Sequence, residues 1–306
     1  MKILTADVGG TFIKYAAWEN MTAYLRGKIS TPLASRTDFF NAIKKIYEES
    51  GAEGIALSLP GVIDSARGIC VKSAALGYNN GCNIVNELGE LCKCPVAVEN
   101  DARCAAMAEA KFGALSDVED GFVMVFGTMI GGALIKNHEV CKGANNSAGE
   151  ISFMRIGHEK IFSDVCSVPA LLKGYAQIKN LSTEKISGEV FFQAVNKNEN
   201  DAVTCLDKFT RRIAEIIFNM QLVIDVSKFA IGGGISAQPA FVDSIRDNLE
   251  KIYFTSPIEF NRVEIVPCKF RNDANLIGAL AHYLKIFSTI FSINSSSSAE
   301  LFPNLR

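Results

Sequence analysis

The sequence lacks any pair of cysteines spaced for a zinc or redox motif. Its nine cysteines include no C-x-x-C pair, and the two nearest, Cys92 and Cys94, form a poor metal-binding or redox motif. An odd number of cysteines without a pattern is typical of reduced thiols. We therefore expect a cytoplasmic protein.

Long apolar runs and an excess of one charge are also missing. The longest apolar stretch, 122–135, is interrupted by glycines and is too short to cross a bilayer. The N-terminus leads directly into a predicted strand at 3–7, so we expect no signal peptide. A net charge of −2 gives no electrostatic reason to bind nucleic acid or an anionic membrane. With 306 residues, 48% of them hydrophobic and 21% charged, the chain is expected to be a soluble enzyme of two domains.

A predicted short strand followed at once by a predicted alanine-rich helix carries the first candidate catalytic residue. Val96–Val98 predicts the strand and Ala102–Ala110 the helix. Asn100 is a good N-cap, and a carboxylate at Asp101 would lie at the positive end of the helix dipole. Ligands of open α/β sheets bind at the carboxyl ends of strands. Asp101 is therefore a candidate catalytic base, although the pair alone could equally be an acidic cap.

The N-terminal segment predicts a hairpin with a bare glycine turn. Strands at 3–7 and 12–18 are joined by a Gly-Gly-Thr turn at 9–11, whose backbone N–H groups can approach a phosphate closely. Asp7 would lie beside that phosphate, which makes it a candidate for positioning magnesium. Lys14 could reach the phosphates or face solvent, and a plain hairpin is the alternative interpretation.

The same strand–glycine–strand pattern recurs about one domain length later in the sequence. A strand at 122–126, a glycine-rich turn at 127–132 and a strand at 133–135 repeat the strand–glycine–strand order. The repeat predicts two duplicated α/β domains whose glycine turns face each other across a cleft and hold a triphosphate between them.

Two further stretches suggest ligand contacts. Glycines at 232–234 follow a predicted strand at 228–231 and precede a predicted helix at 239–249, which would put bare backbone at a helix start, close to a nucleotide. The polar loop 76–80 offers one aromatic ring and two amides, a composition suited to a sugar, but it could equally be a surface turn. The remaining predicted elements are helices at 37–50, 84–91, 168–179, 188–196, 201–224 and 272–286, and strands at 54–59, 68–72 and 263–266.

Five motifs occur in an order that resembles the ROK family of sugar kinases and repressors. They are Asp7-Val-Gly-Gly-Thr11, Glu99-Asn-Asp-Ala-Arg-Cys-Ala-Ala-Met-Ala-Glu109, Gly127-Thr-Met-Ile-Gly-Gly-Ala-Leu134, Ala148-Gly-Glu150 and Ile231-Gly-Gly-Gly-Ile235. The resemblance covers about the first 285 residues. It implies an α/β, actin-like (ribonuclease H-like) ATPase fold with an interdomain cleft. The domains would be 1–112, joined by the last helix 272–287, and 113–271, followed by a flexible tail at 288–306.

The resemblance also implies transfer of the γ-phosphoryl group of ATP to a sugar hydroxyl. Asp101 matches the catalytic base, and Asp7 would position Mg²⁺. The residues expected to contact the sugar are Gly61, Asn79, Asn80, Asn100, Asp101 and Glu150. The residues expected to contact ATP are Asp7, Gly9, Gly10, Thr11, Lys14, Gly127, Thr128, Gly232, Gly233 and Gly234.

The sequence departs from the family pattern at three places. The usual glycine in the second glycine turn is Met129, and the family's histidine three residues after the sugar-binding acid is Phe153. The cysteine-rich zinc segment is missing, since only Cys166 remains between Glu150 and the predicted helix at 168–179. A lone cysteine cannot build a four-ligand zinc site, so we expect no structural zinc.

This zinc-less pattern resembles the bacterial β-glucoside kinase branch of the family, which also has an aromatic after Ala-Gly-Glu and a similar run opening the last helix, here Asn272 to Ala279. The family's acid that follows the third cysteine is lost together with the zinc segment. Losing this acid and the sugar-side histidine would make room for a larger substituent at C1. We therefore expect phosphorylation of the 6-hydroxyl of a β-glucoside such as cellobiose or gentiobiose.

Three alternatives stay open. The first is a glucokinase or N-acetylmannosamine kinase acting on free sugar. The second is a non-catalytic sugar-sensing repressor, a branch that carries an N-terminal helix-turn-helix where this sequence starts at a strand. The third is an actin-like assembly protein or chaperone, against which Asn100-Asp101 and Ala148-Gly-Glu150 favour a sugar. We expect a homodimer, as is usual in the family, with sugar and ATP as small-molecule partners.

Overall fold

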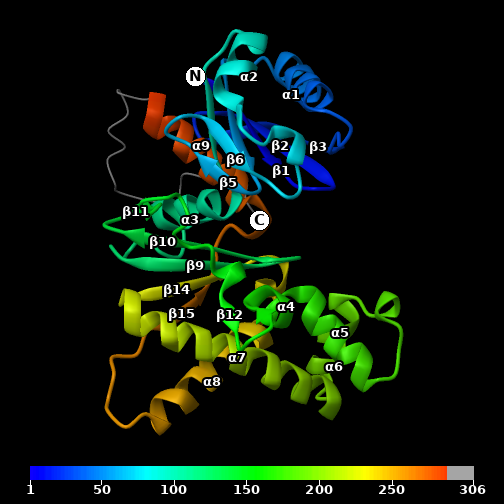
Figure 1. Cartoon of the computed structure of the whole chain (residues 1–306), viewed down its shortest axis with the longest axis vertical. Coiled ribbons are helices and arrows are strands. Elements are labelled where there is room, and N and C mark those ends of the chain that lie inside the picture. The colour runs from blue at the N-terminus through cyan, green and yellow to red at the C-terminus, as the bar shows by residue number, and fades with distance from the viewer. Residues whose placement is uncertain (288–306) are drawn as a thin grey trace. The chain divides into compact units, whose positions relative to one another are not determined.

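The computed structural model describes residues 1–287, and this part of the chain divides into two compact units (Figure 1). Unit 1 comprises Met1–Gly113, Lys142–Ala148 and the residues from Asp273 onward, and unit 2 comprises Ala114–Cys141 and Gly149–Asn272. The predicted flexible tail at 288–306 lies outside the described residues.

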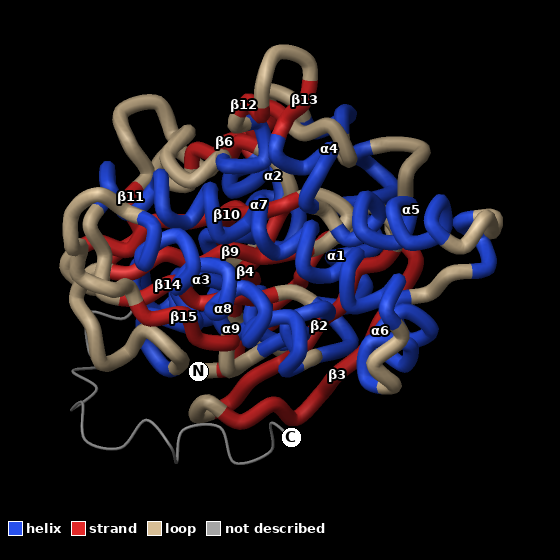
Figure 2. The backbone as a smooth tube through the Cα atoms, turned by 90° about the horizontal axis from the view of Figure 1, so that it is seen from below, coloured by secondary structure: helices blue, strands red, loops and turns tan. Residues whose placement is uncertain are grey.

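A five-stranded sheet in the order β3-β2-β1-β4-β8 forms the centre of unit 1. The first three strands pair antiparallel, whereas β1, β4 and β8 run parallel. All six residues of β4 are buried, as expected for a parallel strand covered on both faces. Figure 2 shows β3 as the outer strand of this sheet. The strands are β1 (Lys2–Val8), β2 (Phe12–Glu19), β3 (Thr22–Ser30), β4 (Gly54–Leu59) and β8 (Val96–Asn100).

Helices cover both faces of this sheet. Phe39 and Ile43 of α1 and Leu88 of α2 share one buried cluster with strand residues, while α9 packs on the other face with α3. The approach of α9 is close, because a Cβ at Gly54 of β4 would lie 2.0 Å from the Tyr283 hydroxyl. The helices are α1 (Arg36–Ser50), α2 (Ile84–Cys92), α3 (Asp101–Phe112) and α9 (Ala274–Phe287). A small second sheet contains β5 (Val62–Asp64), β6 (Ile69–Lys72) and β7 (Cys82–Asn83), with a 3₁₀ helix at Gly77–Asn79.

Unit 2 repeats the plan of unit 1. Its five-stranded sheet has the order β11-β10-β9-β14-β15, again three antiparallel strands followed by parallel ones. The strands are β9 (Gly121–Phe126), β10 (Ile130–Lys136), β11 (Glu139–Cys141), β14 (Lys228–Gly232) and β15 (Glu264–Pro267), with a separate hairpin of β12 (Arg155–Ile156) and β13 (Lys160–Ile161).

One apolar core holds the helices of unit 2 against its sheet. The long helix α7 contributes Phe209, Ile213 and Ile217, which recur at helical spacing on its buried face. The helices are α4 (Phe162–Cys166), α5 (Val168–Ile178), α6 (Gly188–Asn196), α7 (Asn200–Ile224) and α8 (Pro239–Thr255). The 3₁₀ helices are Ile151–Phe153, Thr183–Lys185 and Gly234–Ala237, and a further one at Arg271–Asp273 joins unit 2 to unit 1.

The structure corrects two predictions about the glycine segments. Strand β10 begins at Ile130 rather than at residue 133, because Gly131 and Gly132 pair with β9, so the second glycine turn is only 127–129. The 3₁₀ helix Gly234–Ala237 lies between the triple glycine and α8. The prediction that these glycines open the helix at Pro239 is therefore wrong.

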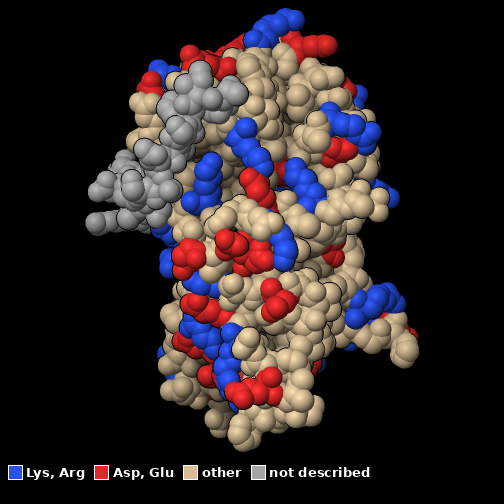
Figure 3. All heavy atoms as spheres, turned by 90° about the vertical axis from the view of Figure 1, so that its left-hand side faces the viewer, with Lys and Arg blue, Asp and Glu red and all other residues tan. Residues whose placement is uncertain are grey.

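The surface shows no strong bias of charge on the face that Figure 3 draws, where basic and acidic side chains are interspersed. Within residues 1–287, no helix is long and apolar enough to cross a membrane. All nine cysteines are free thiols, six of them buried.

Candidate active site

The carboxyl ends of three parallel strands meet at one edge of the unit 1 sheet. In the strand register, Asp7 of β1 lies opposite Ser58 of β4, and Ser58 lies opposite Glu99 of β8. Neighbouring strands are about 4.8 Å apart, so Asp7 and the Glu99-Asn100 end of β8 are two strand spacings apart. The predicted magnesium-positioning acid and the predicted sugar-side segment thus share the edge where α/β sheets bind ligands.

Asp7 is a carboxylate whose surroundings disfavour its charge. Burial raises the pKa of Asp7, and hydrogen bonds from Asn275 and Ser58 together with the nearby Lys14 ammonium offset only part of that rise. The Asn275 amide donates to Oδ1 of Asp7 at 2.8 Å and the Ser58 hydroxyl at 3.4 Å. Lys14 stands directly opposite Asp7 in the β1–β2 register. Such a carboxylate is stabilised when a cation lies beside it.

The glycine turn next to Asp7 is braced from β3. The Gly9 N–H donates to the Phe12 carbonyl at 2.9 Å. The Thr31 hydroxyl donates to the Gly9 carbonyl at 2.7 Å, and the Thr31 N–H donates to the Thr11 carbonyl at 2.9 Å. Gly10 and Thr11 remain exposed. The turn therefore offers exposed backbone on a fixed frame, as contact with a phosphate requires.

Asn100 caps α3, as predicted. Its Oδ1 accepts from the Arg103 N–H at 3.1 Å, while its Nδ2 donates to the Gly61 carbonyl and to Oδ1 of Asp101, both at 2.9 Å. The same Asp101 oxygen accepts from the Ala102 N–H at 2.8 Å. The Asp101 carboxylate is thereby fixed in the first turn of α3, where the helix dipole favours its charge.

Gly61 is held in a conformation that favours glycine. Its φ is +111°, and a Cβ there would lie 2.3 Å from the Lys72 carbonyl oxygen. Its own carbonyl accepts the Asn100 amide. The structure thus joins the predicted residues Gly61, Asn100 and Asp101 in one hydrogen-bonded group.

The loop at 76–80 is more enclosed than predicted. The Asn79 side chain is fully buried, and neither its oxygen nor its nitrogen bonds to any residue in the described range. Asn80 is exposed, but its Oδ1 accepts from the Ser73 N–H at 2.7 Å. The Tyr78 hydroxyl donates to the Pro32 carbonyl at 2.8 Å. Contact between Asn79 and a sugar would therefore require this loop to move.

Glu99 is a buried acid to which the sequence alone assigned no role. It is 0% exposed, and Lys142 lies 2.7 Å from its Oε2. The Ser65 hydroxyl donates to the same oxygen at 2.9 Å, and the Asn100 N–H donates to Oε1 at 2.9 Å. Burial would raise the pKa of Glu99, but Lys142 above all, with His282 and the Asn100 N–H, brings it below its ordinary value. Glu99 is therefore ionised beside the predicted base.

In unit 2, Glu150 precedes the 3₁₀ helix Ile151–Phe153. The chain reaches it through Gly149, at φ +90°, where a Cβ would lie 2.5 Å from the Gly132 carbonyl oxygen. The 3₁₀ helix is anchored by Ser152, whose hydroxyl lies 2.6 Å from the Ser163 hydroxyl. The Phe153 side chain is 59% exposed. The anchored turn thus presents a bare aromatic ring three residues after Glu150.

The glycine segments of unit 2 differ in what they leave accessible. Gly127 donates its N–H to the Met129 carbonyl at 3.0 Å, and Thr128 is exposed. Gly232 is buried, and a Cβ at Gly233 would lie 2.0 Å from the Phe126 carbonyl oxygen, so these two serve close packing on β9. Gly234, in contrast, has open space where a Cβ would lie.

The residues present fit a magnesium ion that arrives with ATP. Within the described part of the chain, no group of three or more His, Cys, Asp or Glu side chains could hold a metal by itself. Magnesium in phosphoryl-transfer sites is bound through one or two carboxylates plus substrate phosphates. A single half-buried carboxylate, Asp7, next to an exposed glycine turn meets that requirement.

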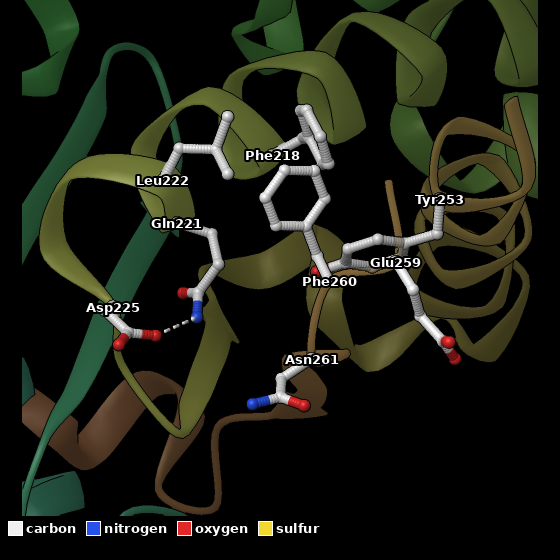
Figure 4. Close-up of a pocket in the computed structure, with 8 residues that line it drawn as sticks. All are labelled: Phe218, Gln221, Leu222, Asp225, Tyr253, Glu259, Phe260 and Asn261. Carbon is white, nitrogen blue, oxygen red and sulfur yellow. Dashed lines mark hydrogen bonds between the residues drawn. The ribbon is translucent and has the colours of Figure 1, made fainter. Parts of the chain in front are cut away.

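A pocket of about 400 Å³ in unit 2 is lined by none of the predicted site residues (Figure 4). Within it, Gln221 donates to Asp225 at 3.2 Å, and the Phe218 ring packs edge-on against the rings of Tyr253 and Phe260. Five of its eight lining residues thus contact one another. They are Phe218, Gln221, Leu222, Asp225, Tyr253, Glu259, Phe260 and Asn261.

Two units of the same strand order, each opened by a glycine hairpin, define the actin-like ATPase fold. The chain belongs to the ROK family, whose profile matches residues 3–286. The predicted fold and family are thus confirmed.

Named relatives and solved structures agree with this assignment. A β-glucoside kinase of Listeria monocytogenes is 28% identical, with 93% of this chain and 98% of that protein covered. An N-acetyl-D-glucosamine kinase of Vibrio atlanticus is 29% identical over 75% of this chain and 83% of that protein. A ROK family protein from Streptococcus pneumoniae, solved in complex with sucrose, is 27% identical and superposes with a TM-score of 0.85, covering 94% of this chain and 99% of that one.

Proposed function

We propose that this protein transfers the γ-phosphoryl group of ATP to the 6-hydroxyl of a β-glucoside such as cellobiose or gentiobiose. The observation that carries the proposal is the exposed Phe153 ring on the anchored turn that follows Glu150. The broader class, an ATP-dependent carbohydrate kinase, is confirmed by the family and its named relatives.

Asp101 acts as the base in this proposal. Hydrogen bonds from Asn100 and Ala102 fix one carboxylate oxygen, so the group can accept a hydrogen bond from the 6-hydroxyl and orient it in line with the γ-phosphorus. The transition state of phosphoryl transfer is loose, so orientation and neutralisation of charge contribute more than proton abstraction. A carboxylate that a helix N-terminus keeps ionised is adequate for this task.

The nucleotide side uses the backbone of the glycine turns. Exposed Gly10 and Thr11 lie on the turn braced by Thr31, where N–H groups can donate to phosphate oxygens. Such preorganised donors stabilise charge that develops on the transferred group. Magnesium, when bound with ATP, would neutralise phosphate charge, and we assign Asp7 to hold it.

The turn geometry favours a substrate larger than one ring. Phe153 donates its N–H to the Glu150 carbonyl at 3.4 Å, the i to i+3 contact of a 3₁₀ turn. Side chains three residues apart in such a turn lie on the same side. A ring beside a sugar-binding acid can carry the apolar face of a second sugar through stacking. The Streptococcus pneumoniae relative was solved in complex with sucrose, a disaccharide, which supports a substrate of two sugar rings.

The alternatives from the sequence differ in the sugar or in catalysis. A glucokinase or N-acetylmannosamine kinase would act on a free sugar, as the N-acetyl-D-glucosamine kinase relative is named to do. A sugar-sensing protein would bind sugar without turnover. The homodimer and the cytoplasmic location stay predictions.

An ADP-release assay with ATP and Mg²⁺ and without added zinc tests the proposal. Cellobiose, gentiobiose, glucose and N-acetylmannosamine are compared at equal concentrations. We expect the highest kcat/KM with the disaccharides. Strong preference for a free sugar would refute the β-glucoside assignment, and sugar binding without ADP release would point to the sensing role.

A further inference from the structure

One segment of the chain belongs to a unit other than that of its neighbours in sequence. Lys142–Ala148 clusters with unit 1, although Cys141 and Gly149 on either side belong to unit 2. The loop is closed on itself by the Ala148 N–H, which donates to the Lys142 carbonyl at 3.2 Å. Glu150, in unit 2, follows two residues after the loop in sequence.

Two basic side chains, Lys142 and Arg103, hold the loop within unit 1, and each forms an ion pair with Glu99. The Lys142 ammonium lies 2.7 Å from Glu99 and also donates to the Ser65 hydroxyl. The buried Arg103 donates to the Asn146 carbonyl at 2.7 Å, and it lies 3.5 Å from the other oxygen of Glu99. The loop is thus anchored to the strand end and first helical turn that carry Asn100 and Asp101.

Because Glu99 is buried, this ion pair is sensitive to the loss of either partner. A carboxylate with no solvent exposure is strongly unfavourable when a partner is removed, because the remaining charge lacks compensation. Lys142 itself is only partly enclosed, with 29% of its side chain exposed, so packing constrains the Lys142 end of the pair less than the Glu99 end. Losing Lys142 should therefore release the loop rather than unfold β8.

We propose that the Lys142–Glu99 ion pair is a positioning device for the sugar, holding the loop at 142–148 against the strand end that bears the base. The inference rests on the proposed function, since it assigns sugar contacts to Asp101 and Glu150. The proposal gives neither Lys142 nor Glu99 a contact with the reacting atoms. Their effect is on the placement of the groups that do.

The chain offers a matched control. Lys136 and Asp120 form an ion pair with an N–O distance of 2.8 Å, but 53% of the Lys136 side chain is exposed. Exposed pairs of this kind contribute little. Lys136→Met therefore removes a lysine charge and a comparable contact without touching the proposed device.

The experiment measures kcat and the KM of sugar and of ATP for wild type, Lys142→Met, Lys142→Arg, Glu99→Gln, the Glu99→Gln/Lys142→Met double variant and Lys136→Met. For Lys142→Met we expect kcat/KM for the sugar to fall by about tenfold to 100-fold, as for a misplaced contact, while KM for ATP stays within about twofold. Lys142→Arg should restore most of the loss. The double variant should lose no more than Lys142→Met alone, because coupled residues do not act additively.

Amide hydrogen exchange of residues 143–148 supplies a readout that does not depend on turnover. We expect faster exchange in Lys142→Met and no change in Lys136→Met. If the wild type phosphorylates no sugar, the proposed function fails, and this exchange still tests the anchor. Unchanged exchange in Lys142→Met would overturn the inference. Faster exchange with unaltered sugar kinetics in an active enzyme would overturn it as well, because the pair would then be only structural.

Discussion

Asn275, in the first turn of α9, donates a hydrogen bond of 2.8 Å to Asp7, at the end of β1. The two residues are 268 positions apart in the chain. The last helix thus reaches the strand edge that carries the proposed magnesium-positioning acid. This bond, the longer one from Ser58 and the nearby Lys14 ammonium offset only part of the effect of burial, so the pKa of Asp7 stays raised.

Asp7→Asn should therefore stabilise the ligand-free protein while it impairs catalysis. Because the folded-state pKa of Asp7 is raised, its contribution to stability is fully present below its unfolded pKa and is lost as pH rises through the folded value. Asparagine keeps an oxygen for Asn275 and carries no charge. At pH 7 we expect a Tm higher by about 2–4 °C, about 1 kcal/mol at this chain length, and kcat reduced by about 100-fold.

Thermal unfolding at pH 4 and pH 7, with kcat measured at saturating ATP and Mg²⁺, checks this expectation. The gain in Tm should be larger at pH 7 than at pH 4. A lower Tm for Asp7→Asn at pH 7 would contradict the prediction that the charge of Asp7 destabilises the folded protein. Unaltered kcat would remove it from the nucleotide site.

Local sequence patterns predicted much of the backbone structure around the site. The Gly9-Gly10 hairpin and the Asn100 cap could be predicted because each depends on residues within a few positions. Strand β3 was not predicted: it lies at the sheet edge, and its Thr22–Ser30 sequence alternates between exposed and half-buried residues, which gives a weak apolar signal.

Long-range contacts could not be predicted from one sequence. Lys142 meets Glu99, and Asn275 meets Asp7, through the three-dimensional path of the chain, and no spacing rule marks either pair. The helix start expected directly after the glycines at 232–234 was also wrong, because a 3₁₀ helix at Gly234–Ala237 intervenes. Gly233 is required because β14 passes close to Phe126, a contact that only the fold creates.

Asp101→Asn should abolish most turnover while the protein stays folded. Asparagine keeps the oxygen that accepts from Ala102, so α3 should remain capped, but it cannot accept the proton of the 6-hydroxyl. We expect kcat to fall at least about 100-fold, the usual range for a positioned acid–base group. Asp243→Asn, in an exposed pair with Arg246, is the control. Near-normal kcat in Asp101→Asn would exclude Asp101 as the base.

The titration of Glu99 should make the free energy of unfolding depend on pH in the acidic range. Its pKa in the folded state is below the ordinary value of 4.5, so its stabilising effect is present above that value and is lost as pH falls through the folded pKa. Lys142, Arg103 and His282 are the basic groups that face it. The difference in unfolding free energy between wild type and Glu99→Gln should therefore shrink below about pH 4.5.

Urea unfolding at pH 7, 5 and 3.5 measures this difference directly. At pH 7 the wild type should be more stable by about 1–3 kcal/mol, the range for hydrogen bonds to a buried charged group. A constant difference across the three pH values would show that Glu99 does not titrate as proposed.

Phe153→Ala should change the choice of sugar more than the rate. Removing the exposed ring takes away the surface proposed for the second sugar but leaves Glu150 and Asp101 in place. We expect kcat/KM for cellobiose to fall by about tenfold, on the order of one stacking contact, and kcat/KM for glucose to stay within about twofold. Phe254→Ala, at a ring that is 88% exposed on α8, is the matched control. Equal losses of kcat/KM for cellobiose and glucose would contradict the proposal that the Phe153 ring stacks on the second sugar.

Gly278→Ala should disrupt the packing of α9 against α3 within unit 1. A Cβ at Gly278 would lie 1.7 Å from the Cys104 carbonyl oxygen of α3, and backbone cannot yield as a flexible side chain does. We expect destabilisation of about 1–3 kcal/mol, as for overpacked cores, together with weaker ATP binding, because the shifted helix carries Asn275. Gly188→Ala, at a glycine of α6 with open space around it, should leave both unchanged. Urea unfolding and titration with a non-hydrolysable ATP analogue test the two effects, and a Gly278→Ala variant as stable as wild type would show that α3 and α9 can separate without loss.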